Sequence, residues 1–140
     1  MTKLASMLIA ASAAVVLLFS LVHLLYTFYG PKLLPRDKEL LARMQEVSPV
    51  ITQKATMWNF WVGFNASHSF GGITFAVVYG YLALVHPAFL FQSSFLQLFG
   101  LAMLSAYLLV AQKYWFRAPL QGLLMATLLY ATALSIIFLR

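Results

Sequence analysis

The sequence of 140 residues contains no cysteine. Disulfide bonds, thiolate catalysis and cysteine-ligated metal or iron–sulfur sites are therefore excluded. The same absence removes the usual indicator of an oxidising or a reducing compartment. Methionine and histidine remain as the only soft or nitrogen ligands for a metal.

Acidic residues are also scarce, and none of the three lies in an apolar stretch: they are Asp37, Glu39 and Glu46. Paired-carboxylate catalysis, proton-coupled export through a buried acid and carboxylate-bridged metal sites are therefore not expected. The sequence has no GxSxG, HExxH or Walker motif. Three histidines without a supporting Asp, Glu or Cys make a poor metal site, so we expect no bound metal ion.

Apolar residues dominate what is present. Hydrophobic residues make up 63% of the chain, charged residues make up 9%, and the mean hydropathy is +0.88. A chain of this length cannot hide so much apolar surface in one water-soluble core, so lipid must be the solvent for most of it. The composition predicts an all-α integral membrane protein with a single transmembrane domain over residues 1–140.

Four apolar stretches are long enough, at about 1.5 Å per residue, to cross a hydrocarbon layer of roughly 30 Å. They cover residues 7–29, 56–84, 94–112 and 118–139 and predict a four-helix bundle. The first could instead be a signal peptide, since Lys3 precedes an apolar run with small residues. The run continues to about Tyr29, too long for a signal core, so we expect a retained helix.

A short amphipathic helix is predicted between the first two stretches, over residues 36–48 and between Pro35 and Pro49. Its apolar residues are Leu40, Leu41, Met44 and Val47, and its charged residues are Lys38, Glu39, Arg43 and Glu46. We expect it to lie along the membrane surface. It could be a solvated connector packed under the bundle or a gate for a substrate.

Basic residues give the expected topology. Seven fall in two loops on one side of the membrane: Lys32, Arg36, Lys38, Arg43, Lys54, Lys113 and Arg117. The positive-inside rule places these loops in the cytoplasm and both termini outside, and the short loops favour a bacterial inner membrane. The scattered positive charge predicts contact with anionic membrane lipid and no binding of nucleic acid, which needs a clustered basic face.

The second apolar stretch carries a polar and aromatic stripe. On a helical wheel one side gathers Trp58, Trp61, Asn65, His68, Gly72 and Tyr79. A carboxamide or imidazole facing hydrocarbon without a partner costs about 2–7 kcal/mol, so Asn65 and His68 must have partners. His23 in the first stretch can face them, with His68 about one helical turn, or roughly 7 Å, deeper in the membrane.

That offset suits a proton or hydrogen-bond relay better than a haem held by two histidines, whose nitrogens must share one iron axis. Haem therefore ranks low among the cofactors considered, and no other cofactor is indicated. A plain structural role, in which His23 bonds a carbonyl or a tyrosine hydroxyl, is also compatible with the sequence.

Small residues form two ridges on the same predicted helix. One contains Gly63, Ser67 and Gly71, and the other contains Gly72, Ala76 and Gly80. Such ridges let helix backbones approach closely in lipid. Either another helix of the chain or a second copy in a homo-oligomer could fill them.

The segment MWNFWVGFNASHSFGG, after a first stretch that ends LVHLLYTFYGP, resembles a group of small uncharacterised bacterial four-helix membrane proteins with a G-F-N-x-S-H-S motif. The resemblance covers most of the chain and implies no activity. The plan of four spans and a charged first loop is also similar to that of the trimeric membrane proteins of eicosanoid and glutathione metabolism. The sequence lacks the Glu-Arg, Arg and Asn pattern around the second helix of those enzymes, so no site residues are carried over.

Three functions follow as hypotheses. In the first, a lipid, a quinone or another small apolar ligand meets Asn65 and His68 as polar anchors between walls formed by Trp61 and Tyr79. An enzyme would add His68 as general acid or base, with His23 or Tyr26 as relay. The alternatives are a structural or accessory subunit of a larger membrane complex and a haem-bearing electron carrier.

Overall fold

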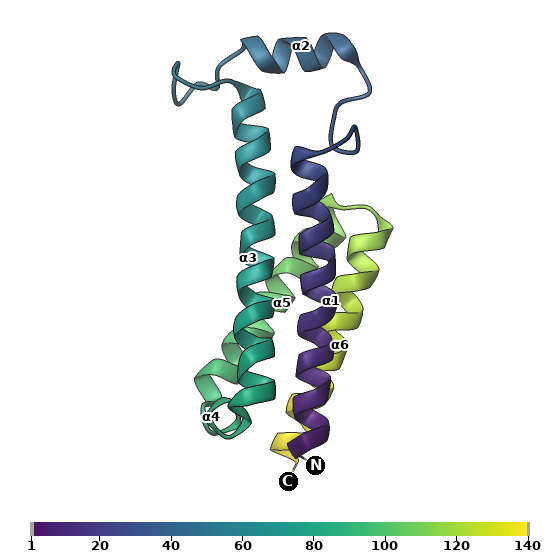
Figure 1. The fold of residues 1–140 in the computed structure, drawn as a ribbon, viewed down its shortest axis with the longest axis vertical. Helices are drawn as coiled ribbons and strands as arrows, with labels where there is room; N and C mark the ends of the chain where they lie inside the picture. Colours follow the sequence, from purple (N-terminus) through teal and green to yellow (C-terminus); the bar gives the residue numbers. More distant parts are fainter. Residues whose placement is uncertain (1, 140) are drawn as a thin grey trace. The chain divides into compact units, whose positions relative to one another are not determined.

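The computed structural model describes residues 2–139 and contains helices but no strands within that range. The helices are α1 (Thr2–Phe28), α2 (Lys38–Glu46), α3 (Met57–Val85), α4 (Pro87–Gln92), α5 (Ser94–Tyr114) and α6 (Arg117–Phe138) (Figure 1). Four of them, α1, α3, α5 and α6, are long and apolar enough to cross a membrane. The chain is a multi-pass membrane protein, and the predicted all-α four-helix class is confirmed.

The ends of two predicted helices need correction. Helix α1 begins at Thr2, before the expected start at residue 7, because the polar first turn continues the helix although it lowers the local hydropathy. Helix α2 is shorter than the predicted 36–48. Asp37 is extended and caps the helix, with its carboxylate accepting from the backbone N–H of Glu39 at 2.9 Å, so the first helical residue is Lys38.

The described chain divides into two compact units. Unit 1 comprises the residues up to 19 and from 72 onward, which include most of α1, the later part of α3, and α4 to α6. Unit 2 comprises residues 20–71, which include the end of α1, α2 and the beginning of α3. A single transmembrane domain over the whole chain remains a prediction.

Alanine is the commonest residue in the core of unit 1. Its buried members are Ala5, Ile9, Ala13, Val16, Phe75, Ala76, Tyr79, Ala83, Leu90, Leu104, Ala126, Tyr130, Ala133 and Leu134. Small side chains at so many of these positions allow the helix backbones to approach closely, which favours dispersion contacts where lipid supplies no hydrophobic drive.

Helices α1 and α6 run antiparallel in this unit. The hydroxyl of Ser12 donates to the carbonyl of Ala126 at 2.8 Å, and a Cβ added at Gly122 would lie 2.5 Å from the ring of Phe19. Higher numbers on α1 thus meet lower numbers on α6. The two contacts fix the spacing of the pair.

Helix α4 was not expected from the hydropathy pattern. Its six residues begin with Pro87, which suits the first helical position because its missing N–H would have no intrahelical partner. Ser93 ends α4 and caps α5, with its hydroxyl accepting from the backbone N–H of Leu96 at 3.2 Å. A helix this short lies below the window over which hydropathy averages.

Unit 2 holds α2 across the neighbouring ends of α1 and α3 (Figure 1). Gly30, with φ of 79°, turns the chain after α1, as glycine does at helix C-termini. The N–H of Met57 donates to the carbonyl of Val47 at 2.8 Å, and the indole N–H of Trp61 donates to the carbonyl of Leu33 at 3.1 Å. The segment between α1 and α3 is therefore hydrogen-bonded to the beginning of α3 both before and after α2.

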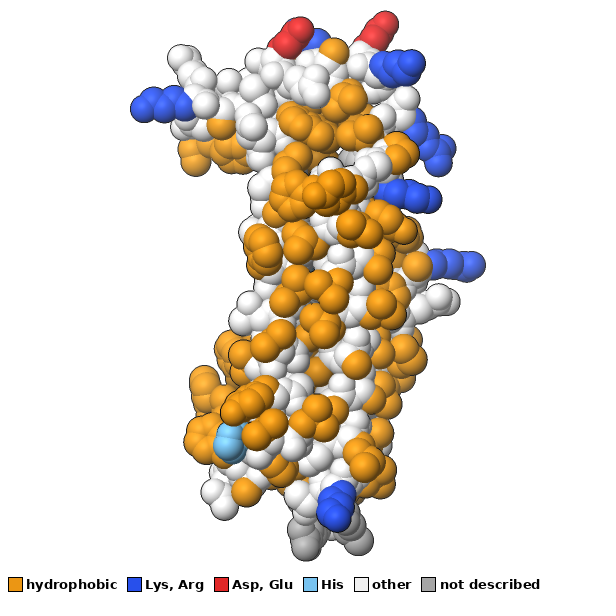
Figure 2. All heavy atoms as spheres, viewed as in Figure 1, with side chains coloured by type: hydrophobic (Ala, Val, Ile, Leu, Met, Phe, Trp, Pro, Cys, Tyr) orange, Lys and Arg blue, Asp and Glu red, His pale blue; other side chains and the backbone are white. Residues whose placement is uncertain are grey.

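No residue of α2 is fully buried: on its apolar side Leu41 and Met44 are partly buried, and Leu40 is exposed. Val50 and Ile51, in the turn that follows α2, are also fully or largely exposed. Figure 2 shows charged side chains gathered over this connection, with apolar side chains directly beside them. The position of this segment on a membrane surface stays a prediction.

Candidate functional site

The polar stripe of α3 meets α1 at three side chains, His23, Asn65 and His68, which we call the imidazole–amide cluster. The Nε2 atom of His23 lies 3.0 Å from Oδ1 of Asn65. The rings of His23 and His68 meet edge to face, with their centroids 5.5 Å apart. All three belong to unit 2, and two spans therefore contribute to one polar group.

The direction of the hydrogen bond follows from the other contacts of Asn65. Its Nδ2 atom lies 2.7 Å from the carbonyl oxygen of Trp61, which can only accept, so Nδ2 is the donor there. The oxygen Oδ1 is then the atom that faces His23. Because Oδ1 is an acceptor, Nε2 of His23 must carry the proton, and a neutral His23 keeps its lone pair on Nδ1.

The ring of His68 contacts the rings of His23 and Phe64. Asn65 is buried at 7% exposure, whereas both histidines are only partly buried. The ring of Phe64 stacks on His68, with the centroids 6.3 Å apart. The expected separation of about 7 Å between the two histidines considered only the rise along the helix axes. The side chains reach along the axes and bring the rings to 5.5 Å.

The hydroxyl groups near the cluster are satisfied by their own helices. Thr27 donates to the carbonyl of His23 at 2.8 Å, Ser69 donates to that of Asn65 at 2.9 Å, and Ser67 donates to that of Phe64 at 3.0 Å. Hydroxyls in membrane helices commonly bond in this way. None of these three hydroxyls therefore links α1 to α3 through the hydrogen bond described.

Of the aromatic residues assigned to the site by sequence, two belong to unit 2 with the cluster and one does not. Trp61 and Tyr26 are about two-fifths exposed, and the indole N–H of Trp61 is held by the carbonyl of Leu33. Tyr79 is buried in the core of unit 1 and donates to the carbonyl of Leu96 at 2.7 Å. Tyr79 and the cluster belong to different units, so the wall expected from Tyr79 stays a prediction.

The two glycine ridges of α3 have different surroundings. In unit 1, Gly72 and Ala76 are buried, and a Cβ at Gly80 would meet that of Ala13 on α1 at 3.6 Å, an ordinary contact. In unit 2, Gly63 and Ser67 are exposed and Gly71 is only partly buried. A Cβ at Gly63 would meet nothing within 4 Å. The ridge of Gly72, Ala76 and Gly80 therefore serves packing inside the chain. The ridge of Gly63, Ser67 and Gly71 is open.

The cluster does not fit a haem held by two histidines. Nε2 of His23 is engaged by Asn65, and the edge-to-face contact between the rings leaves no space for a macrocycle between them. Among residues 2–139, no group of three His, Asp or Glu side chains is placed to hold a metal ion. His86 is exposed, and its Nε2 lies 3.1 Å from the hydroxyl of Tyr81.

Sequence reasoning missed a second polar group, around Gln97 at the start of α5 in unit 1. The hydroxyl of Tyr130 donates to the backbone carbonyl of Gln97 at 3.2 Å. The side-chain nitrogen of Gln97 donates to three carbonyls, those of Leu90, Phe91 and Ser93, at 3.4, 3.0 and 3.3 Å. The buried Oε1 has no hydrogen-bond partner among the described residues.

Gly100 makes this arrangement sterically feasible. A Cβ at that position would collide with the hydroxyl of Tyr130 and would lie 2.7 Å from both Tyr130 Cζ and Tyr79 Cε1. The spacing of Gln97 and Gly100, one turn apart on α5, was the available signal for a buried polar crossing.

Comparison with known proteins adds no family to this description. No protein-family model, curated protein or solved structure matches the chain.

Proposed function

We propose that this multi-pass membrane protein holds a small, largely apolar ligand of the lipid or quinone class, anchored by His23, Asn65 and His68. The observation that carries the proposal is the meeting of two partly buried imidazoles from different spans with one buried carboxamide. A carbonyl or hydroxyl oxygen on an otherwise apolar molecule is the kind of group that such a cluster recognises.

The energetics favour a binding role over a purely structural one. Interhelical hydrogen bonds in membranes contribute about 0.6 kcal/mol on average, whereas burying an unpaired polar group costs about 2–7 kcal/mol. The free energy gained from one hydrogen bond between helices is therefore small compared with the cost of placing two imidazoles in a membrane span. Ionisable residues within spans are accordingly functional by default.

The hydrogen-bond pattern leaves specific positions for a ligand. Both polar atoms of the Asn65 side chain are engaged: Oδ1 accepts from His23, and Nδ2 donates to the carbonyl of Trp61. His23 retains Nδ1 as an acceptor, and His68 is partly exposed. A ligand hydroxyl would donate to His23, and Trp61 and Tyr26 supply exposed aromatic surface in the same unit.

A reaction at the site would depend on His68. Imidazole exchanges protons near neutral pH, so His68 would act as general acid or base, with His23, whose ring contacts it, as relay. Binding without reaction requires the same residues.

A second candidate function, an accessory or self-associating subunit, is favoured by the open ridge at Gly63 and Ser67. Both residues are exposed, and Phe64 between them is 70% exposed. A helix of another copy or another protein could pack there. His68 would then only fix the register of α3.

We further propose that the protein lies in a bacterial inner membrane with α2 in the cytoplasm and both termini outside. The basic loops support this orientation, because Lys and Arg are retained on the cytoplasmic side. Anionic membrane lipid is the expected partner of these loops, and nucleic acid is not.

The proposal is tested by ligand-dependent stability of the purified full chain. Delipidated wild type and His68→Phe are melted alone, with a short-chain ubiquinone and, separately, with phosphatidylglycerol. A ligand at 100 times its Kd should stabilise wild type by about 2.7 kcal/mol. We expect at least one of the probes to raise the Tm of wild type and to act weakly on His68→Phe.

The matched control is His86→Phe, which makes the same substitution at an exposed loop position. It should respond to the probes as wild type does. If neither probe stabilises wild type, or if His68→Phe gains as much as wild type, the ligand proposal fails. An absorbance spectrum of the same sample tests haem, and a Soret band would contradict our assignment.

A further inference from the structure

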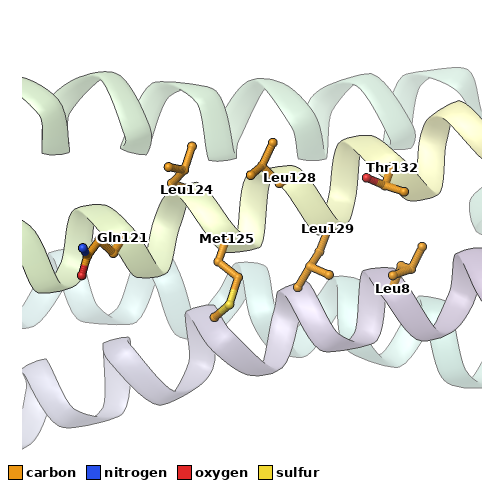
Figure 3. A pocket seen from close by; sticks show the side chains of 7 residues that line it. All are labelled: Leu8, Gln121, Leu124, Met125, Leu128, Leu129 and Thr132. Atoms are coloured by element: carbon orange, nitrogen blue, oxygen red, sulfur yellow. The ribbon is translucent and has the colours of Figure 1, made fainter.

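A groove of ≈ 360 Å³ runs along α6 where it faces α1 in unit 1. It is lined by Leu8, Gln121, Leu124, Met125, Leu128, Leu129 and Thr132. Figure 3 shows Met125 and Leu129 directed from α6 toward α1, with Gln121 at one end and Thr132 near the other. The groove is open along its length, and its lining is almost entirely apolar.

The dimensions of the groove fit one acyl chain. Gln121 and Thr132 are eleven residues apart, which is about 16 Å along a helix and roughly half of a hydrocarbon core of about 30 Å. The groove therefore covers about one leaflet. A helix of about 10 Å diameter over the same length would occupy roughly 1,200 Å³, far more than the groove offers.

The charges near one end of the groove have no counter-charge in the unit. Arg117 precedes Gln121 by four residues, one turn along the same face of α6, and Lys113 lies in the last turn of α5. The sequence of unit 1 has no Asp or Glu at all. Lys113 lies over the ring of Tyr114, 5.2 Å from its centroid, and finds no carboxylate there. A phosphate group would supply the missing negative charge.

We propose that this groove binds a phospholipid with an anionic headgroup. One acyl chain lies along Met125 and Leu129, and the phosphate lies beside Arg117, with Gln121 between the polar and apolar parts. The site is separate from the imidazole–amide cluster and goes beyond the function proposed for it.

The test compares lipid binding to the detergent-solubilised full chain by native mass spectrometry. The probes are phosphatidylglycerol and phosphatidylcholine with identical acyl chains. Wild type should prefer phosphatidylglycerol. Arg117→Gln should reduce this preference about fivefold, the effect expected for one basic residue near a headgroup.

The apolar half of the proposal is tested by filling the groove. Leu128→Trp should lower the occupancy of both lipids, and because Leu128 is 58% exposed, the larger side chain can be accommodated without displacing a core residue. Met125→Trp provides a second filling variant. The control is Leu109→Trp, because Leu109 is 67% exposed on α5 and does not line the groove.

Three outcomes would overturn the proposal: an unchanged lipid preference in Arg117→Gln, unchanged occupancy in both filling variants, or conversion of a dimer to a monomer by Leu128→Trp. The last would assign the groove to a second copy of the chain. His68→Phe should leave lipid binding at the groove intact, so failure of this proposal and failure of the ligand site are distinguishable.

Discussion

His23 on α1 donates through Nε2 to Oδ1 of Asn65 on α3, across 3.0 Å, and this is the direct side-chain hydrogen bond between the two spans within unit 2. Asn65 is further fixed by the carbonyl of Trp61 at 2.7 Å. The carboxamide is thus pre-oriented by its own helix to accept from the other. The contributions of His23 and Asn65 to stability should therefore be energetically coupled.

A double-mutant cycle with His23→Ala and Asn65→Ala should therefore give a coupling energy of about 0.6–1.7 kcal/mol, the range found for interhelical bonds in membranes. The measurement is the free energy of unfolding of the four proteins in mixed micelles. Thr27→Ala is a suitable control for His23, since Thr27 bonds only the carbonyl of its own helix at 2.8 Å. Strict additivity of the two substitutions would contradict the assigned bond.

The crossing at Gly100 predicts a strong response to a single methyl group. Gly100→Ala places a Cβ 2.7 Å from the rings of Tyr79 and Tyr130, so the tyrosines or α5 must shift. We expect a loss of about 1–3 kcal/mol, as in other overpacked cores. The measurement is the unfolding free energy in detergent.

Gly63→Ala is the matched control for this prediction, because its Cβ meets nothing within 4 Å. It should be neutral or slightly stabilising, since alanine is favoured over glycine in helices by about 1 kcal/mol. Equal destabilisation by both substitutions would show that glycine itself, and not the tyrosine contact, is needed in these helices.

Gln97 should tolerate loss of its amide better than conversion to an acid. Its Nε2 faces three carbonyl oxygens, so Gln97→Glu would set a buried carboxyl group against acceptors and should cost about 3 kcal/mol or more. Gln97→Leu loses those bonds but also removes the unpartnered Oε1, and should cost about 1–2 kcal/mol. Comparison of their Tm values decides the order, and the reverse order would reject the orientation of the amide.

The absence of cysteine allows a clean test of the α2 connection. Val50→Cys, in the exposed turn after α2, would carry an environment-sensitive fluorophore. If the turn rests on the membrane surface as we propose, its emission should shift to the blue in vesicles with an anionic lipid. With the proposed topology, bilayer-impermeant quenchers should reach it only from the cytoplasmic side. A water-like spectrum in both anionic and neutral vesicles would contradict the surface position.

The four long helices could be predicted because hydropathy over about twenty residues is a strong signal. The short helix α4 could not, because six residues carry too little pattern, and its start depends on Pro87 and its end on Ser93. The start of α2 was misplaced by the dual role of Asp37, which belongs to the polar pattern of the helix but caps it from outside.

The candidate site shows where a helical wheel stops being informative. The wheel gives an angle and no depth: Trp61 and Tyr79 share a face but are eighteen residues apart, about 27 Å along the axis. A shared face is therefore not by itself evidence of a shared site, and the hydroxyl of Tyr79 donates to the carbonyl of Leu96 within unit 1. The relation of Gln97 and Gly100 to Tyr130 depends on how α5 and α6 are rotated, which periodicity alone does not determine.

The antiparallel pairing of α1 with α6 has a consequence for chain connectivity. Ser12 bonds Ala126, and Leu8 shares a groove with Thr132, so the first turns of α1 approach the last turns of α6 (Figure 1). A cut in the exposed turn at Val50 would therefore leave α1 and α6 on different fragments that still share this hydrogen bond and this groove.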